Sequence, residues 1–185
     1  METKEQRILA VAYRLFNQHG FRKVTMSDIA EAAEMSRPSL YAAFANKEAV
    51  FGAIGVRHAA RCEELTAEQL PRATTLRAKL DRLFAIWILD PFAAVVDSPA
   101  GLDMLGNAAT YAPEAVGQTY AAFEGHLTSV LKPEMTGKRR MTAKDLARIL
   151  TLATRGLKAS TATLAELKRM TDGLIAMAIA TTEAA

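Results

Sequence analysis

The chain has 185 residues and a mass of 20.0 kDa, which corresponds to one domain or to a small domain fused to a modest one. Half of its residues are hydrophobic, and glycine and proline are few, so the disordered, collagen-like and low-complexity classes are excluded. The 36 alanines favour an all-α protein, because alanine has the highest helix propensity.

Positive charge is concentrated near the N-terminus. The formal net charge is +3, and residues 1–61 hold nine Lys and Arg against six Asp and Glu, whereas the remainder holds 14 of each. The whole surplus therefore lies in the first third of the chain, where we expect an anionic partner to bind.

Three features of the sequence indicate the cellular compartment in which the protein is located. The single cysteine, Cys62, cannot form an intramolecular disulfide, and the polar opening residues do not resemble a signal peptide. The longest uninterrupted apolar run, from Leu174 to Ala180, is far shorter than the roughly 18 residues that a membrane span needs. We therefore expect a cytoplasmic protein that does not cross a membrane.

Two helices are predicted in the first 35 residues. Apolar residues recur at three- and four-residue spacing from Ile8 to Phe16, which indicates a helix over about residues 4–19. Thr25 is placed to cap a second helix, with Asp28 as the acidic partner of a capping box.

Two more helices are predicted directly after these. Ser36 is placed to cap a third helix, which tolerates Pro38 in its first turn. Asn46 is placed to cap a fourth, and an apolar stripe extends this helix from Lys47 to Pro71. That length exceeds the usual helix of a globular protein, so we expect this helix to link two parts of the molecule.

The pattern of the remaining sequence predicts a second helical domain. Residues 76–89 are apolar nearly all round and should form its buried centre. Prolines divide the chain beyond residue 89 into further helices, and Lys138–Arg140 is expected to be a solvated loop. The prolines are Pro91, Pro99, Pro113 and Pro133, and the candidate helices lie near 101–110, 114–131, 142–159 and 163–181. About nine helices are thus expected, with domains at residues 1–50 and 51–185.

Residues 25–44 contain the pattern of a helix-turn-helix. Two helices of about eight residues flank a four-residue turn, Glu34 to Arg37, and in this arrangement the second helix enters the major groove of DNA. The sequence Leu-Tyr-Ala-Ala-Phe-Ala-Asn-Lys-Glu from Leu40, with Asp-Ile-Ala upstream, resembles the DNA-binding domain of the TetR family of bacterial transcription regulators. The resemblance covers about residues 5–52. The family's usual turn glycine is replaced by Glu34, which would cost about 1 kcal/mol if positive φ is needed there.

The resemblance implies a set of DNA contacts. Thr25, Tyr41 and Lys47 would bind phosphates, whereas Arg37 and Ser39 would face base edges, and Ser36 completes the set. Each residue also has an ordinary structural reading: Thr25 and Ser36 as helix caps, Tyr41 as a surface aromatic and Lys47 as a first-turn charge. Arg37 can contact phosphate as readily as a base.

The resemblance also implies a dimer and a ligand pocket. In the family the last two helices pair with those of a second subunit, while the pocket lies within helices five to seven. Interface candidates are Ile149, Ala153, Gly156, Leu157, Leu167, Met170, Leu174 and Met177, and pocket candidates are Phe84, Trp87, Met104, Tyr111, Tyr120, Phe123 and His126. Either set can instead belong to the monomer core.

These observations predict a homodimeric DNA-binding repressor that binds a palindromic operator and is released by a small-molecule effector. An activator, an effector-independent regulator, or a helical ligand-binding or catalytic protein without DNA binding are the alternatives. No catalytic or nucleotide-binding motif is present, and the pair His58 and Cys62 provides too few ligands for a metal site, so we expect no enzyme activity, no cofactor and no metal.

Overall fold

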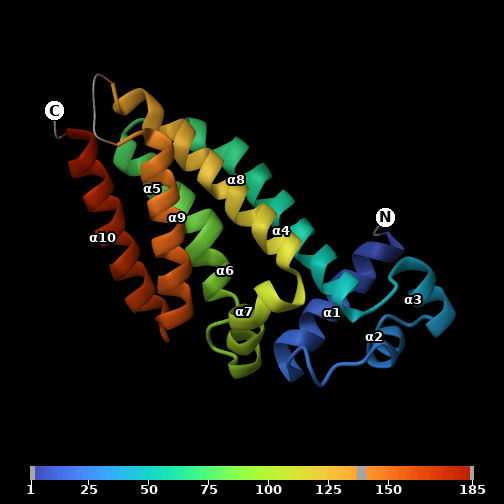
Figure 1. The fold of residues 1–185 in the computed structure, drawn as a ribbon. Coiled ribbons are helices and arrows are strands. Elements are labelled where there is room, and N and C mark those ends of the chain that lie inside the picture. The colour runs from blue at the N-terminus through green and yellow to red at the C-terminus, as the bar shows by residue number, and fades with distance from the viewer. Residues whose placement is uncertain (1–2, 137–140, 184–185) are drawn as a thin grey trace. The chain divides into compact units, whose positions relative to one another are not determined.

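In the computed structural model, which describes residues 3–136 and 141–183, every regular element is helical (Figure 1). In chain order these are α1 (Lys4–His19), α2 (Met26–Ala32), α3 (Arg37–Ala43), α4 (Lys47–Gln69), α5 (Leu76–Phe84), α6 (Asp90–Ala93), α7 (Pro99–Tyr111), α8 (Pro113–Leu131), α9 (Ala143–Ser160) and α10 (Leu164–Glu183), with 3-10 turns at η1 (Leu70–Arg72) and η3 (Lys132–Glu134) and a π-helical segment η2 (Ala85–Leu89). Because α5, η2 and α6 are continuous, the described ranges support the predicted all-α fold with its long helical stretches. The predicted loop at Lys138–Arg140 lies outside the described residues.

The predicted caps begin the N-terminal helices. Thr25 Oγ1 accepts from the Asp28 amide at 3.2 Å while Asp28 Oδ2 accepts from the Thr25 amide at 2.8 Å, which is the predicted capping box. Ser36 Oγ accepts from the Ser39 amide at 3.3 Å, and Asn46 accepts from the first turn of α4. Local hydrogen bonds thus set where α2, α3 and α4 begin.

The turn between α2 and α3 requires positive φ at Glu34. This residue has φ of 55°, and the amide of Met35 donates to the Ala30 carbonyl at 3.0 Å. This bond, from the second residue after the C-cap Ala33 back to the last turn of α2, is the Schellman pattern, which places its left-handed residue where glycine is usual. The strain that the sequence predicted at this position is therefore present.

Pro91 does not end a helix, contrary to the prediction. The chain stays helical from α5 through η2 into α6, because the Asp90 amide donates to the carbonyl of Ala85, five residues back. The wider π turn inserts one residue ahead of the proline, and this gives room for a ring that would clash with the preceding turn of a regular α-helix. By contrast, Pro99 and Pro113 begin α7 and α8 as expected.

The chain divides into two compact units. Unit 1 consists of Met1–His58 and Val95–Gln118, and unit 2 of Ala59–Ala94 and Thr119–Ala185. The chain crosses from one unit to the other three times: within α4, after Ala94 and within α8. Unit 1 therefore contains α7 and the first part of α8 as well as the N-terminal helices.

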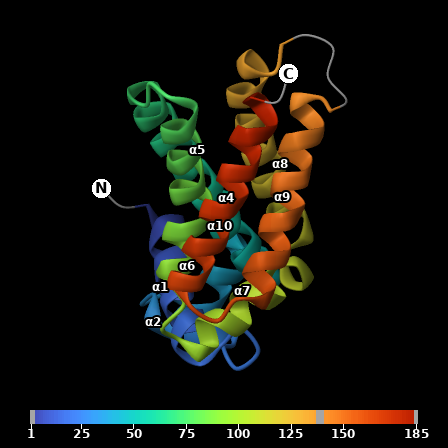
Figure 2. The same ribbon diagram turned by 90° about the vertical axis from the view of Figure 1, so that its left-hand side faces the viewer.

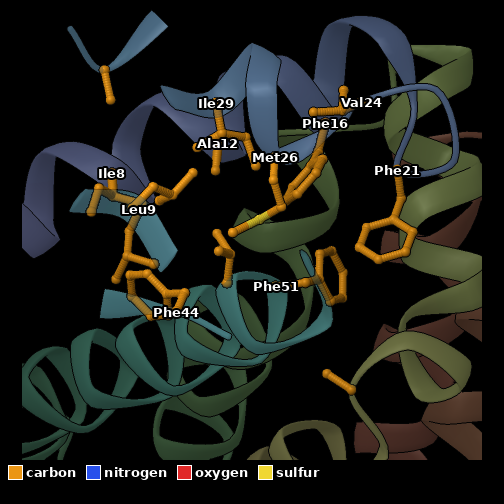
Figure 3. Close-up of a cluster of buried hydrophobic side chains, with 14 of the residues drawn as sticks. Ile8, Leu9, Ala12, Phe16, Phe21, Val24, Met26, Ile29, Phe44 and Phe51 are labelled. Atoms are coloured by element: carbon orange, nitrogen blue, oxygen red, sulfur yellow. The ribbon is translucent and has the colours of Figure 1, made fainter. Parts of the chain in front are cut away.

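The core of unit 1 is built around α1. Figure 3 shows Ile8, Ala12 and Phe16 of this helix facing Met26 and Ile29 of α2. Leu40 is completely buried and Phe44 nearly so. Burial of these side chains fixes which face of α3 is turned toward the core. Burial of each such side chain contributes roughly 1.5–3 kcal/mol.

Aromatic rings join four segments of unit 1. Phe21, in the connector after α1, lies 5.2 Å from Phe16 and 5.2 Å from Phe51 of α4, between ring centroids. Tyr111, the last residue of α7, stacks on Phe21 at 3.9 Å and meets Phe51 edge-on. At the other end of α7, Ser98 Oγ donates to the Asn17 carbonyl at 2.6 Å, so α7 is held to the end of α1.

In unit 2, α10 packs between α5 and α9 (Figure 2). Leu80, Leu83, Phe84, Trp87 and Ile88 are all buried, so the second half of the predicted segment 76–89 forms part of the core. In the first half, Arg77, Asp81 and Arg82 are exposed, so α5 is amphipathic there and not apolar all round as predicted.

We predict that Glu34→Gly is more stable to unfolding than Glu34→Ala by about 1 kcal/mol. Glycine adopts φ of 55° without the Cβ clash, whereas alanine keeps the clash and loses only the carboxylate. Urea unfolding followed by circular dichroism measures the difference. Equal stability of the two variants would show that the turn stores no strain.

Candidate functional site

The outer face of α3 is the first candidate site. Burial of Leu40 points the opposite side of this helix toward solvent, where Arg37 is exposed and Tyr41 is 53% exposed. Within residues 3–136 and 141–183 no hydrogen bond engages either side chain. Both side chains are therefore accessible to a ligand, Arg37 in the first turn of α3 and Tyr41 in the second.

Two of the predicted phosphate donors are engaged in the structure. The Thr25 hydroxyl donates to Asp28 Oδ2 at 2.8 Å, and together with the Thr25 amide this holds the pKa of Asp28 below its usual value. The Lys47 ammonium donates to the carbonyls of Phe21 at 2.7 Å and Val24 at 2.9 Å, and it lies 4.4 Å from the Phe21 ring centroid. Lys47 thus fixes the connector between α1 and α2, a structural role that the sequence pattern does not reveal.

Lys4 contributes to this surface, although sequence reasoning missed it. Its ammonium donates to Ser39 Oγ at 2.6 Å from the start of α1. Arg22 and Lys23 are exposed in the connector next to Phe21. The adjacent basic pair was a visible signal, whereas a contact over 35 residues, like that of Lys4 with Ser39, leaves no local pattern.

The second candidate site is an aromatic cluster in unit 2. The Phe84 and Phe123 rings lie 5.4 Å apart, Trp87 lies 6.3 Å from Phe123, and His126 lies 5.6 Å from Trp87. Trp87 Nε1 donates to Thr66 Oγ1 at 2.9 Å, and His126 Nε2 pairs with a Glu63 carboxylate oxygen at 2.8 Å. Four of the predicted pocket residues therefore meet.

Two predicted pocket residues do not join this cluster. Met104 is a core residue of unit 1 and Tyr111 packs against that core, where α7 lies against α1. The sequence could not reveal these neighbours, because an apolar side chain on a helix does not show which element will cover it, and a role of the two residues in a pocket stays a prediction.

Tyr120 lies beside two cations that sequence reasoning missed. The Arg155 guanidinium carbon is 5.0 Å from the Tyr120 ring centroid, and Lys158 Nζ is 5.8 Å from it. Burial lowers the pKa of Lys158 to about 8 and raises that of Tyr120. Lys158 follows Thr154 by one turn on the buried stripe of α9. A charged residue on an otherwise apolar stripe could have indicated this buried cation from the sequence.

The third candidate site is the outer face of α9 and α10. Ile149 and Leu152 are 48% and 47% exposed, and Met177 is 60% exposed. Leu152 was missed by the sequence prediction. Ala153, Leu157 and Met170 are half-buried, and Gly156 is exposed. Two predicted interface residues belong to the core of unit 2 instead: Leu167 is fully buried and Leu174 is 9% exposed.

Other chemistry finds no support in the described residues. The Cys62 thiol donates to the Ile86 carbonyl at 3.5 Å, and burial raises its pKa to about 11. Residues 3–136 and 141–183 hold no group of three His, Cys, Asp or Glu side chains arranged to bind a metal. The described helices are also too short or too polar to span a bilayer.

We predict that Lys158→Met stabilises the protein by about 1–3 kcal/mol at pH 7 and that this gain disappears near pH 10.5. The folded pKa lies below the unfolded value, so between pH 8 and 10.5 the unfolded chain binds more protons and wild-type stability rises with pH. Urea unfolding at both pH values measures the gain, with Lys144→Met on the exposed start of α9 as control. A gain that is equal at both pH values would contradict the prediction.

Comparison with known proteins identifies the N-terminal region. Residues 8–54 match the family model described as bacterial regulatory proteins, tetR family. The HTH-type transcriptional repressor ComR of Escherichia coli (strain K12) is 31% identical over 120 residues, which cover 56% of this chain and 49% of ComR. The match thus spans about half the length of that relative.

Solved structures share the fold over 95% of the chain. The fatty acid degradation regulator FadR of Bacillus halodurans superposes with a TM-score of 0.73 at 16% identity, covering 95% of this chain and 96% of its own. Thermus thermophilus FadR, a TetR-family repressor solved with lauroyl-CoA, gives a TM-score of 0.65 at 19% identity, covering 95% and 93%. The N-terminal region, residues 8–54, which contains the helix-turn-helix of α2 and α3, therefore matches the DNA-binding domain of the tetR family of bacterial regulatory proteins, and the chain shares the fold of these solved regulators.

Proposed function

We propose that the chain is a homodimeric transcriptional repressor that binds a palindromic DNA operator and releases it when a small-molecule effector binds. The observation that carries the proposal is the exposed outer face of α3, with Arg37 and Tyr41 accessible beside the basic connector. In a helix-turn-helix this face enters the major groove. DNA binding is assigned to residues 1–50 and effector sensing with dimerisation to residues 51–185.

The contacts on DNA divide by chemistry. Arg37 can donate two hydrogen bonds to the O6 and N7 acceptors of guanine, and the neighbouring Ser39 adds a short donor. Tyr41 and the Thr25 hydroxyl reach phosphates, for which the Thr25 hydroxyl must leave Asp28. Lys47 contributes mainly by holding the connector, since carbonyl oxygens already surround its ammonium.

Dimerisation supplies a second recognition helix, which reads the second half-site of the operator. A palindromic operator is read by two recognition helices about 34–36 Å apart, which a two-fold dimer provides. Ile149 and Leu152 of α9 and Met177 of α10 are large exposed apolar side chains that a second subunit would cover, and the exposed Gly156 allows a second helix to approach closely. Large exposed apolar side chains grouped on one face are typical of an interface.

Release results from a shift between two states of the dimer. An effector that prefers a geometry with the wrong half-site spacing lowers DNA affinity by its differential affinity for the two states. The change reaches unit 1 through the three chain crossings, of which α4 and α8 are continuous helices. Because α7 is held to α1 by the Ser98 bond, a displacement of α7 also acts on the DNA-binding helices.

Selection of bound duplexes from random DNA, at several salt concentrations, tests the function. We expect a palindromic site to be selected and its affinity to fall steeply with salt, because phosphate contacts release counterions. A protein that binds no duplex more tightly than bulk DNA is not the proposed repressor.

We predict that Arg37→Ala weakens binding to the selected site by about 1–3 kcal/mol and relaxes the preference at one base position. Tyr41→Phe should weaken all duplexes by a similar factor, because it removes only a phosphate donor. Binding assays on the selected site and on single-base variants separate the two effects. A uniform loss in Arg37→Ala would assign Arg37 to the phosphate backbone.

We predict that Met177→Arg converts the dimer to a folded monomer, whereas Leu174→Arg lowers helical content. Met177 is exposed, so its charge disturbs only a partner, while a charge at the buried Leu174 has no partner and costs several kcal/mol within unit 2. Sedimentation gives the mass and circular dichroism the helical content. A Met177→Arg variant that remains dimeric at micromolar concentration would exclude this face.

A further inference from the structure

A groove of about 400 Å³ lies between α10 and the helix formed by α5, η2 and α6, within unit 2. Its apolar lining includes Phe84, Leu89, Leu164 and Ile175. This volume lies within the range of small-molecule sites, which combine apolar walls with a few polar groups. Because Phe84 also contacts Phe123, the groove adjoins the aromatic cluster that includes Trp87.

The groove is lined by more negatively charged than positively charged side chains. Three carboxylates, on Asp81, Asp90 and Asp172, line it together with two cations, Arg77 and Lys168. The guanidinium of Arg77 is shared, because its Nε donates to Asp81 at 2.9 Å and its second terminal nitrogen to Asp172 at 3.2 Å. One positive charge is thus divided between two carboxylates on opposite walls.

Asp90 is the one of the three groove carboxylates to which Arg77 does not donate a hydrogen bond. Within the described chain no hydrogen bond or ion pair engages the side chain of Asp90 or Lys168, so a ligand can approach both side chains. With a formal surplus of one negative charge and a phenyl ring among its lining groups, the groove favours a cation over an anion.

We propose that this groove binds an organic cation, an amine with an apolar body, and that such a compound is the effector. The ammonium faces Asp90, and the body lies against Phe84, Leu89 and Ile175. The assignment as effector depends on the proposed repressor function, whereas binding to the groove does not.

The position of α10 explains how a ligand in the groove acts on the dimer. At 100° per residue, the groove-lining residues Leu164, Lys168, Thr171 and Ile175 lie on one side of α10, and Gly173 and Met177 lie on the opposite side. The same helix therefore carries a wall of the groove and the exposed apolar face. A ligand that moves this wall also moves the proposed dimer contact.

Two probes of opposite charge test the groove. Phenylbutylamine and phenylbutyrate share an apolar body, so titration calorimetry of the intact chain without DNA isolates the effect of charge. We expect the amine to bind more tightly by about fivefold or more, which is the size of an accessible ion pair, and to change Trp87 emission. Equal or tighter binding of the carboxylate would overturn the proposal.

Variants then locate the site. Asp90→Asn should weaken the amine about fivefold, whereas Lys168→Met should tighten it, because removal of a like charge increases the negative surplus. Glu166→Gln, an exposed carboxylate on α10 outside the groove, is the matched control and should change nothing. Ala93→Phe should block the groove, and circular dichroism confirms that each variant folds. Unchanged affinity in Asp90→Asn and in Lys168→Met would show that the amine binds elsewhere.

The DNA assay distinguishes the two proposals. Amine binding without any specific DNA binding would refute the repressor function and leave the groove as a cation site. Specific DNA binding that the amine does not weaken would refute its role as effector.

Discussion

The meeting of Phe16, Phe21, Phe51 and Tyr111 determines how the DNA-binding helices are held. Phe21 contacts the other three rings, so a short connector is fixed simultaneously to α1, α4 and α7. Lys47 adds its ammonium to the Phe21 face and to the carbonyls on either side. The cluster attaches the C-terminal end of α7, while the Ser98 bond to the Asn17 carbonyl holds its other end. The recognition helix, at seven residues, is too short to be stable alone and depends on this support.

The same cluster joins α7 to the N-terminal helices. A division near residue 50 separates functions along the sequence, but compactness places α7 and the first part of α8 with the N-terminal helices. Gly101 illustrates how closely α7 approaches its neighbours, since a Cβ there would lie 2.8 Å from the Val95 carbonyl and 3.2 Å from Asn17 Oδ1. Unit 1 therefore contains α7 in addition to the helix-turn-helix, and in the proposed repressor a displacement of α7 would act on the DNA-binding helices directly.

Local signals were predictable from the sequence, and long-range ones were not. The bounds of α1, the caps at Thr25, Ser36 and Asn46, and the strained turn at Glu34 depend on interactions within four or five residues. Pro91 does not end the helix as predicted, because the π turn of η2 before it gives room for the proline ring. The neighbours of Tyr111 and Leu174 could not be predicted, because an amphipathic stripe shows that a residue is covered, but not which element covers it. Engagement of Lys47 by carbonyls over 20 residues away is likewise invisible in the pattern.

The buried state of Cys62 has a practical consequence. Its thiol is covered by unit 2, bonded to the Ile86 carbonyl and protonated at neutral pH, so it reacts slowly with alkylating reagents. A cysteine introduced on an exposed position of α3, such as Ala42, would therefore be labelled selectively without altering the natural chain elsewhere. In the proposed dimer, a spin label at that position on each subunit would report the separation of the two recognition helices in solution, with and without a ligand.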